Sequence, residues 1–200
     1  MANSNQATRR PSAPSGDGRR RRSDDSRRRI VAAMLEIVRD DGVVPSADLV
    51  AERAGVGRRT VFRLFRDMES LYRELHGAML TRIEHIRSMP IEGDDWRARL
   101  TGVIDRRVQL FEEIMPIKIV ADGLRSDSAF LQGTHEETTR TLRQMLMFVL
   151  PKAIKDDSER FEALDATLSF EMWRRLRHEQ KLSLKAARRV IDKIMAAIAA

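Results

Sequence analysis

Apolar residues recur along the chain at the three- and four-residue spacing of amphipathic helices, and no segment alternates between apolar and polar residues for long enough to indicate a strand. Serines or aspartates that can cap a helix precede several of these segments, and glycines or prolines follow them. The pattern predicts helices over about 23–42, 46–54, 58–65, 67–88, 94–114, 126–150, 158–177 and 183–199, with a short helix or turn at 116–123. The expected fold class is all-α.

The predicted helices fall into two groups. Those within 23–75 fit a small N-terminal three-helix unit that leads into a long helix, and those within 76–200 fit a larger helical bundle. Residues 1–22 stand apart because they are rich in Ser, Pro and Gly and hold almost nothing apolar that a core would bury. That composition predicts a disordered tail.

Charge is distributed unevenly along the chain, which carries a formal net charge of +7. The tail has six arginines against one aspartate, a net charge of +5, whereas residues 23–75 have ten arginines and ten acidic residues. An arginine-rich tail can act as an arm that binds phosphates by displacing counterions. It can equally be a tail that only keeps the protein soluble, and both interpretations stay open.

Composition excludes several classes of protein. The 200 residues contain no cysteine, which rules out disulfides, thiolate metal sites and cysteine nucleophiles. No apolar run reaches the roughly 18 residues of a membrane span, and the N-terminus lacks the apolar core of a secretory signal. We therefore expect a cytoplasmic protein that has no membrane partner.

The histidines give little support for catalysis. His76 and His85 fall on nearly opposite faces of one predicted helix, and His135 has no second ligand at the spacing of a helical zinc pair. The chain also lacks a glycine-rich phosphate loop and a nucleophile elbow. We expect no enzymatic activity, no metal and no cofactor.

Residues 46–65 have the spacing of a helix-turn-helix. In this unit a small residue stands where two helices nearly touch, a turn-forming residue stands between the helices, and apolar residues fix their crossing angle. The small residue is Ala51 and the turn former is Gly55, while the five apolar positions hold Val50, Ala54, Val56, Val61 and Leu64. All seven positions fit, so we predict a unit that binds double-stranded DNA.

The helix predicted over 58–65 would present a basic face to DNA. With Val61 and Leu64 turned inward, the residues that face outward are Arg58, Arg59, Thr60, Phe62 and Arg63. Arginine near the start of a recognition helix can donate two hydrogen bonds to guanine O6 and N7 in the major groove. The alternative is a pair of surface helices with a basic edge and no role in DNA binding.

These residues resemble the tetracycline-repressor (TetR) family. The resemblance rests on DLVAERAGV at 48–56, RRTVFRLF at 58–65 and ESL at 69–71, and it is strong across about 24–75. It implies an all-helical homodimer that binds DNA through its first three helices and senses a small molecule in its C-terminal domain. It also implies that Ser46 caps the second helix near a phosphate and that Arg58 to Thr60 read bases.

Three residues depart from the family pattern. Phe62 replaces a common tyrosine that contacts phosphate, Met68 replaces a lysine that commonly begins the fourth helix, and Gly57 replaces a serine. Glycine gives the third helix a weaker cap, although we still place Gly57 at the DNA-binding surface. Together with the zero net charge of residues 23–75, these departures predict a weak electrostatic hold on DNA and favour a role for the tail.

The helix predicted over 158–177 is apolar on two faces. One stripe is formed by Phe161, Leu164, Leu168, Met172 and Leu176, and the other by Ala163, Ala166, Phe170 and Trp173. A helix with two apolar faces has to be buried on both. Together with 183–199 it fits a four-helix interface of a homodimer. The alternative is a central helix in a monomeric core.

Polar residues on inward-facing stripes mark a candidate ligand site. Arg107 falls within the apolar stripe of 94–114, and Thr134, His135 and Thr138 lie along or beside that of 126–150. A core-facing arginine needs an anionic partner, which a bound carboxylate or phosphate could supply, with the threonines orienting it. Arg107 could instead pair with a protein acid or extend to solvent.

Taken together, these patterns predict a DNA-binding transcriptional regulator. By the resemblance it is a repressor that binds a pseudo-palindromic operator as a homodimer and is released by a small-molecule effector. The alternative is a nucleoid-type structural protein that uses the same helix-turn-helix and has no effector. The two differ in sequence preference, because a two-fold symmetric dimer favours half-sites about one helical turn apart.

Overall fold

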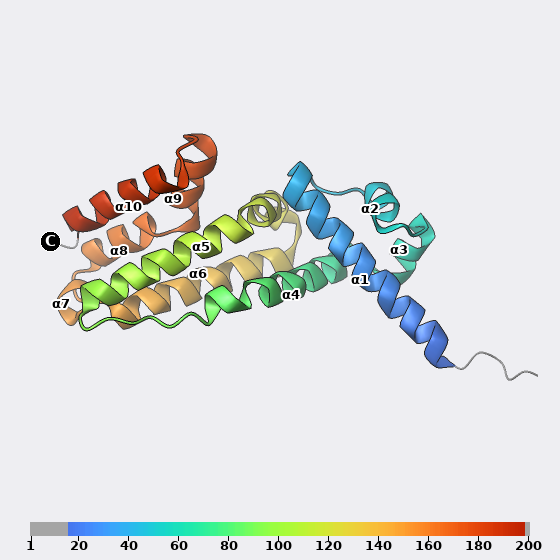
Figure 1. Cartoon of the computed structure of the whole chain (residues 1–200), viewed down its shortest axis with the longest axis horizontal. Helices are drawn as coiled ribbons and strands as arrows, with labels where there is room; N and C mark the ends of the chain where they lie inside the picture. The colour runs from blue at the N-terminus through green and yellow to red at the C-terminus, as the bar shows by residue number, and fades with distance from the viewer. Residues whose placement is uncertain (1–15, 199–200) are drawn as a thin grey trace, which may run out of the picture.

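The computed structural model describes residues 16–198, and the regular elements in that range are all helical, which confirms the all-α fold class. The elements are α1 (Gly16–Asp41), α2 (Ala47–Ala54), α3 (Arg58–Leu64), α4 (Met68–Arg87), α5 (Trp96–Gly123), η1 (Arg125–Asp127), α6 (Ala129–Val149), α7 (Lys152–Lys155), α8 (Ser158–Thr167), α9 (Phe170–Arg174), η2 (Arg175–Glu179) and α10 (Leu184–Ile198). The molecule is elongated, with α2 and α3 near one end and α7 at the other (Figure 1). None of the helices within 16–198 combines the length and the apolar character that a membrane crossing needs.

Side-chain caps determine where several helices begin. Asp67 Oδ1 accepts a hydrogen bond from Ser70 N at 2.7 Å, and Ser183 Oγ accepts one from Ala186 N at 3.2 Å. Each cap satisfies a backbone N–H that the first turn of a helix leaves unbonded. The predicted starts of α4 and α10 therefore agree with the structure to within a residue or two.

Two hydrophobic clusters organise the chain. The first is formed by α1, α2, α3 and the start of α4, and it includes Ile30 and Ile37, both 0% exposed. The second is larger and is built from α4, α5, α6 and the C-terminal helices. α4 belongs to both, because Leu71 packs in the first cluster and Ile83 in the second. The domain boundary predicted at 75/76 falls inside this continuous helix, and the division into domains stays a prediction.

α1 begins earlier than the composition predicts. Residues 16–22, expected within the disordered tail, form the first turns of α1. Arginine is a good helix former, and four arginines follow one another at 19–22. The rest of the predicted tail, residues 1–15, lies outside the described residues.

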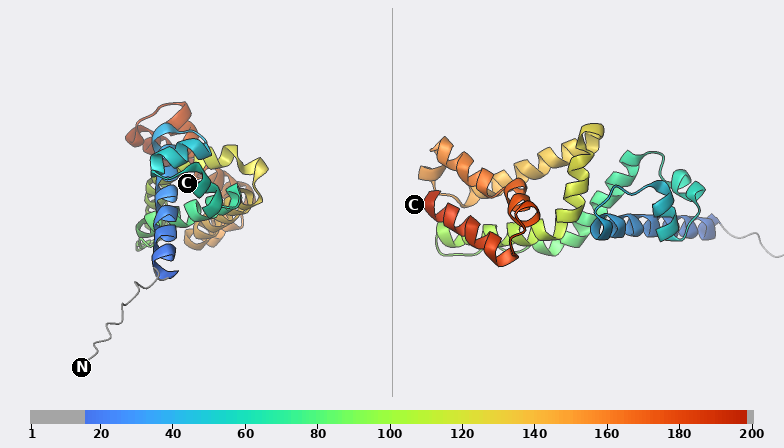
Figure 2. Two further views of the ribbon diagram at one scale, coloured as in Figure 1. Left: turned by 90° about the vertical axis from the view of Figure 1, so that its right-hand side faces the viewer. Right: turned by 90° about the horizontal axis from the view of Figure 1, so that it is seen from above.

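α5 runs from Trp96 to Gly123, although Pro116 predicts an end near Ile114. Proline inside a helix removes one backbone hydrogen bond, and the helix bends rather than ends when packing holds both sides. Ile114 is buried before the proline, and Ile119 packs against the same cluster after it. Figure 2 shows that the end of α5 turns away from its first part.

The helix predicted over 158–177 is broken between α8 and α9. Ser169 Oγ accepts a hydrogen bond from Met172 N at 3.2 Å and caps α9 as a separate helix. The break reorients the side chains that follow, so Phe170 and Trp173 are buried in the core of the chain itself. The continuous two-faced helix is therefore absent, and it gives no argument for a dimer.

Candidate nucleic-acid interface and adjoining cavity

α2 and α3 pack as the helix-turn-helix spacing predicts. The apolar positions of the pattern and Ala51 lie in or against the first cluster, with Val50, Ala51, Ala54 and Val61 buried and Val56 and Leu64 partly buried. Gly55 has a φ of 61°, in the left-handed region that favours glycine, and its N–H donates to the Glu52 carbonyl at 3.1 Å. A three-residue turn between two short helices that share one core is consistent with a helix-turn-helix.

Arg27 joins α3 to the two longer helices of this unit. Its guanidinium donates to the Leu64 carbonyl at 2.8 Å, pairs with Glu74 of α4 at 2.7 Å, and lies 5.1 Å from the centroid of the Phe65 ring. α3 has seven residues, which is too few for a stable isolated helix. Arg27 therefore helps to hold α3 in place on α1 and α4.

α3 exposes the side chains that are predicted to face DNA. Arg58, Arg59, Phe62 and Arg63 are exposed, and Thr60 is half-buried. Ser46 is also exposed, and its Oγ accepts a hydrogen bond from Leu49 N at 3.2 Å as the cap of α2. Because that bond uses a lone pair, the Ser46 hydroxyl can still donate to a phosphate.

Arg58 is positioned by two neighbours on the same surface. Its Nη1 donates to Asp48 at 3.2 Å, and its guanidinium lies 5.5 Å from the centroid of the Phe62 ring. An ion pair between exposed groups contributes little, so Arg58 can exchange Asp48 for a base or a phosphate. Gly57 precedes α3 without a side-chain cap, as its lack of a hydroxyl predicts.

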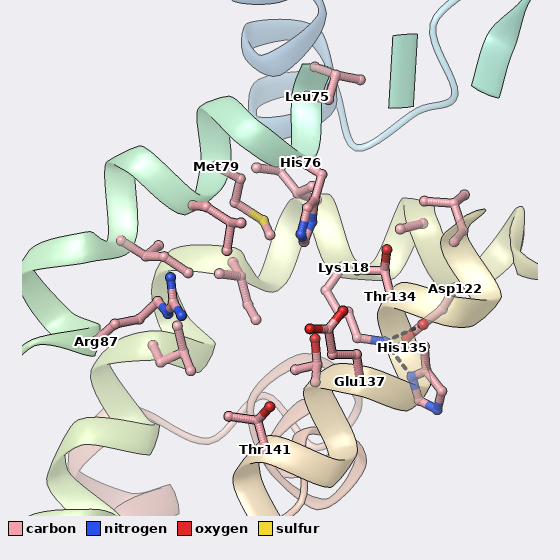
Figure 3. Close-up of a pocket in the computed structure, with 18 of the residues that line it drawn as sticks. Leu75, His76, Met79, Arg87, Lys118, Asp122, Thr134, His135, Glu137 and Thr141 are labelled. Carbon is pink, nitrogen blue, oxygen red and sulfur yellow. Dashed lines mark hydrogen bonds and ion pairs between the residues drawn. The ribbon is translucent and has the colours of Figure 1, made fainter. Parts of the chain in front are cut away.

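A cavity of about 480 Å³ lies between α1, α4, α5 and α6. Its walls are mainly apolar, and α1 contributes Met34 and Val38 to them. All the residues that the sequence marks as ligand contacts line it: Arg107, Thr134, His135 and Thr138. The close-up in Figure 3 shows Thr134 and Thr141 on the α6 side of the cavity and Met79 on the α4 side. Their role in binding a ligand stays a prediction.

Arg107 is 3% exposed, and within residues 16–198 it neither pairs with a protein acid nor extends to solvent, the two outcomes that the alternative interpretation predicts. Its Nη1 donates to the Leu168 carbonyl at 2.8 Å and its Nη2 donates to the Leu142 carbonyl, while its Nε has no hydrogen-bond partner among the residues that the structure describes. Burial lowers the pKa of Arg107 to about 10, so the guanidinium stays charged at neutral pH. Arg107 thus joins α5 to α6 and to the start of the α8–α9 connection through neutral carbonyls.

Lys118, Asp122 and His135 form a polar cluster at one side of the cavity (Figure 3). Lys118 Nζ pairs with Asp122 and lies 3.2 Å from His135 Nδ1. Burial, and then the charges of Lys118 and Arg125, lower the pKa of His135, and burial also lowers the pKa of His76 across the cavity. Both imidazoles are therefore neutral at pH 7.

Lys118 and Asp122 were missed from the sequence because they follow Pro116. If the helix ended at the proline, its inward face would not include Lys118 and Asp122. Continuing the helical period through the proline places Lys118 on the same face as Arg107 and Ile114, since eleven residues correspond to about three turns. That extended periodicity was the signal that could have found them.

The comparisons with known proteins support a transcriptional regulator of the helix-turn-helix (HTH) type. The chain is similar to an uncharacterized HTH-type transcriptional regulator of Mycobacterium bovis, with 30% identity over 113 residues, which cover 56% of this chain. The matched region spans about half the length of that relative, 51%. No family model and no solved structure matches the sequence.

Proposed function

We propose that the protein is a DNA-binding transcriptional regulator of the TetR family that acts in the cytoplasm and has no catalytic activity. It binds a pseudo-palindromic operator as a homodimer, represses transcription while bound, and is released by a small-molecule effector. The similarity to an HTH-type regulator and the TetR-like residues of 48–65 support this proposal.

The observation that carries the proposal is the basic face of α3. Arg58, Arg59 and Arg63 are exposed on a short helix whose opposite side is packed in the first cluster. The N-terminal end of such a helix fits the major groove, where arginine can read guanine directly.

Support for a homodimer comes from α8 and α10, which pack side by side. Apolar side chains on these helices remain partly or fully open to solvent in the single chain: Ala163, Ala166, Val190 and Ile194. A second copy related by a two-fold axis would cover them in a four-helix interface. This interface uses the predicted segments 158–177 and 183–199, in the broken form that the structure gives them.

Support for an effector comes from the position of the cavity. Its volume of about 480 Å³ lies in the range of small-molecule sites. It is lined by α4 and also by Met34 and Val38 of α1, the helix on which α2 and α3 pack. A ligand in this cavity would therefore contact the DNA-binding unit directly.

Selection of binding sites from random DNA tests the proposal. The full-length protein is expected to enrich a pseudo-palindrome whose half-sites are centred about 10 base pairs, or a multiple of that, apart. Sedimentation of the same sample should give a species of about twice the 23.0 kDa chain mass. Enrichment of no sequence, with broad coating of DNA, would favour the nucleoid-type protein instead, and a species of 23.0 kDa would contradict the dimer.

Replacing Arg19 and Arg20 with glutamine is expected to weaken binding to all DNA sequences alike. Both side chains are exposed in the first turns of α1, and glutamine maintains the helix while removing charge. A plot of log affinity against log salt concentration should become shallower by about 0.9 for each phosphate that the variant no longer neutralises. The matched control replaces Arg140 and Lys152, which are exposed on other helices. An unchanged slope in the Arg19 and Arg20 variant would show that this end of α1 does not contact DNA.

A further inference from the structure

The cavity is lined by more positive than negative side chains. Its formal cations are Arg87, Arg106, Arg107 and Lys118, and its carboxylates are Glu84, Asp122 and Glu137, which leaves an excess of one positive charge. Arg87 pairs with Glu84 at 3.3 Å, and Lys118 pairs with Asp122. The neutral His76 and His135 add no charge at pH 7.

The unpaired charge is concentrated at two neighbouring arginines of α5. Arg106 donates to the Arg87 carbonyl, and Arg107 donates to the carbonyls of Leu142 and Leu168. Within residues 16–198 neither guanidinium forms an ion pair with a carboxylate. Glu137, the remaining acid, offsets one of these two positive charges, which leaves the formal excess of one.

Of these two arginines, Arg107 has the positive charge that is less well compensated. It is 3% exposed, and its Nε has no hydrogen-bond partner in the described range 16–198. The carboxylate whose charge acts on Arg107 is that of Asp165, and it is already paired with Arg143 at 3.0 Å. A buried charge held only by neutral carbonyls is stabilised by any anion that enters the adjoining space.

The rest of the cavity suits an apolar molecule. α4 contributes Met79 and Ile83, and α5 contributes Ile114 and Ile117. On the α6 side, Thr134 and Thr138 lie one helical turn apart and offer hydroxyl donors. The cavity thus has apolar walls on α4 and α5 and hydroxyl donors on α6, and these donors lie on the side where Arg107 of α5 donates to the Leu142 carbonyl of α6.

Building on the regulatory role proposed above, we propose that the ligand of this cavity is a mainly apolar molecule with one carboxylate. Its apolar body fills the space between α4 and α5. Its carboxylate lies on the side of Arg107 and the α6 threonines, where one negative charge balances the excess positive charge of the wall. A single carboxylate fits better than a phosphate dianion because the excess is one charge.

Calorimetric titration of the full-length protein with three ligands that share a ten-carbon chain tests this inference. Decanoate, 1-decanol and decylamine differ only in a negative, neutral or positive head group. Decanoate is expected to bind at least tenfold more tightly than 1-decanol, and decylamine more weakly than both. Equal affinities for the acid and the alcohol, or tightest binding of the amine, would overturn the proposal.

Variants locate the carboxylate. Arg107→Met is expected to reduce the ratio of decanoate to 1-decanol affinities to about one, while retained binding of 1-decanol shows that the cavity is intact. Because Arg107 also bonds two carbonyls, Thr138→Val provides a second variant of nearly unchanged shape, with decanoate affinity expected to fall several-fold more than that of 1-decanol. Arg140→Met, an equal charge change at an exposed position of α6, should leave the ratio unchanged.

These titrations contain no DNA, so their outcome is separate from that of the proposed function. A protein that selects an operator but shows no preference for decanoate would retain the regulator and lose the anionic ligand. A protein that prefers decanoate but binds no DNA would retain the anionic ligand and lose the regulator. Unchanged discrimination in both Arg107→Met and Thr138→Val would show that the carboxylate does not lie where we place it.

Discussion

Replacing Arg59 with alanine is expected to lower affinity for the selected DNA site by about tenfold to a hundredfold for each half-site, because a two-bond contact to guanine contributes roughly 1–3 kcal/mol of discrimination. Arg59 is exposed near the start of α3, the end that we expect to enter the major groove. It is a better test than Arg58, which is held by Asp48 in the free protein. Fluorescence anisotropy with the selected site and with a scrambled duplex measures the effect.

The scrambled duplex distinguishes base reading from a general loss of charge. Binding to it should weaken much less than binding to the selected site, since Arg59 is expected to read a base rather than a phosphate. Arg140→Ala, an equal change on the exposed surface of α6, should alter neither affinity by more than about twofold. Equal losses on both duplexes would assign Arg59 to the DNA backbone instead.

Replacing Phe111 with alanine is expected to lower the free energy of unfolding by about 3–5 kcal/mol, the usual cost of truncating a buried phenylalanine. Phe111 is 3% exposed in the second cluster, and its ring lies edge-on to Phe170 with centroids 5.6 Å apart. The substitution removes this contact and leaves a cavity between α5 and α9. Urea denaturation followed by circular dichroism at one protein concentration gives the value.

The same substitution at Phe148 is the matched control. Phe148 is 83% exposed at the end of α6, so Phe148→Ala should change the free energy of unfolding by no more than about 0.5 kcal/mol. A loss of about 3–5 kcal/mol for both variants would mean that a second copy of the chain buries the Phe148 ring. A small change for both would mean that Phe111 does not contribute to the core as its burial indicates. Repeating both measurements at a lower protein concentration tests the first outcome, because only a dimer contact depends on concentration.

The N-terminal unit could be predicted well from the sequence because its signals are local. Ala51, Gly55 and the apolar residues around them are fixed by the contacts of two short helices, so their spacing is readable within twenty residues. The boundary between α3 and α4 could also be predicted, since the side chain of Asp67 caps the start of α4. The start of α1 could not, because composition alone does not show that residues 16–22 continue a helix that packing stabilises further along.

The C-terminal half was harder because its breaks depend on tertiary packing. Pro116 bends α5 without ending it, and Ser169 separates α8 from α9 inside a run of apolar residues. The inward face of α6 and the position of Arg107 were predicted correctly. The carbonyl partners of Arg107 could not be predicted, because the backbone of α6 and of the α8–α9 connection reaches it only in the folded chain.

α4 is shared by the two hydrophobic clusters, and this has a thermodynamic consequence. The helix is anchored at Leu71 among α1, α2 and α3 and lines the cavity further along, at Met79 and Ile83. If DNA and a ligand bind as proposed, the orientation of α4 is one variable on which both binding events depend. Linkage is reciprocal, so a ligand that lowers affinity for DNA by some factor must itself be bound more weakly to the DNA complex by the same factor. Occupied operators would therefore raise the ligand concentration needed for a response, and the threshold would depend on how many operators the cell contains.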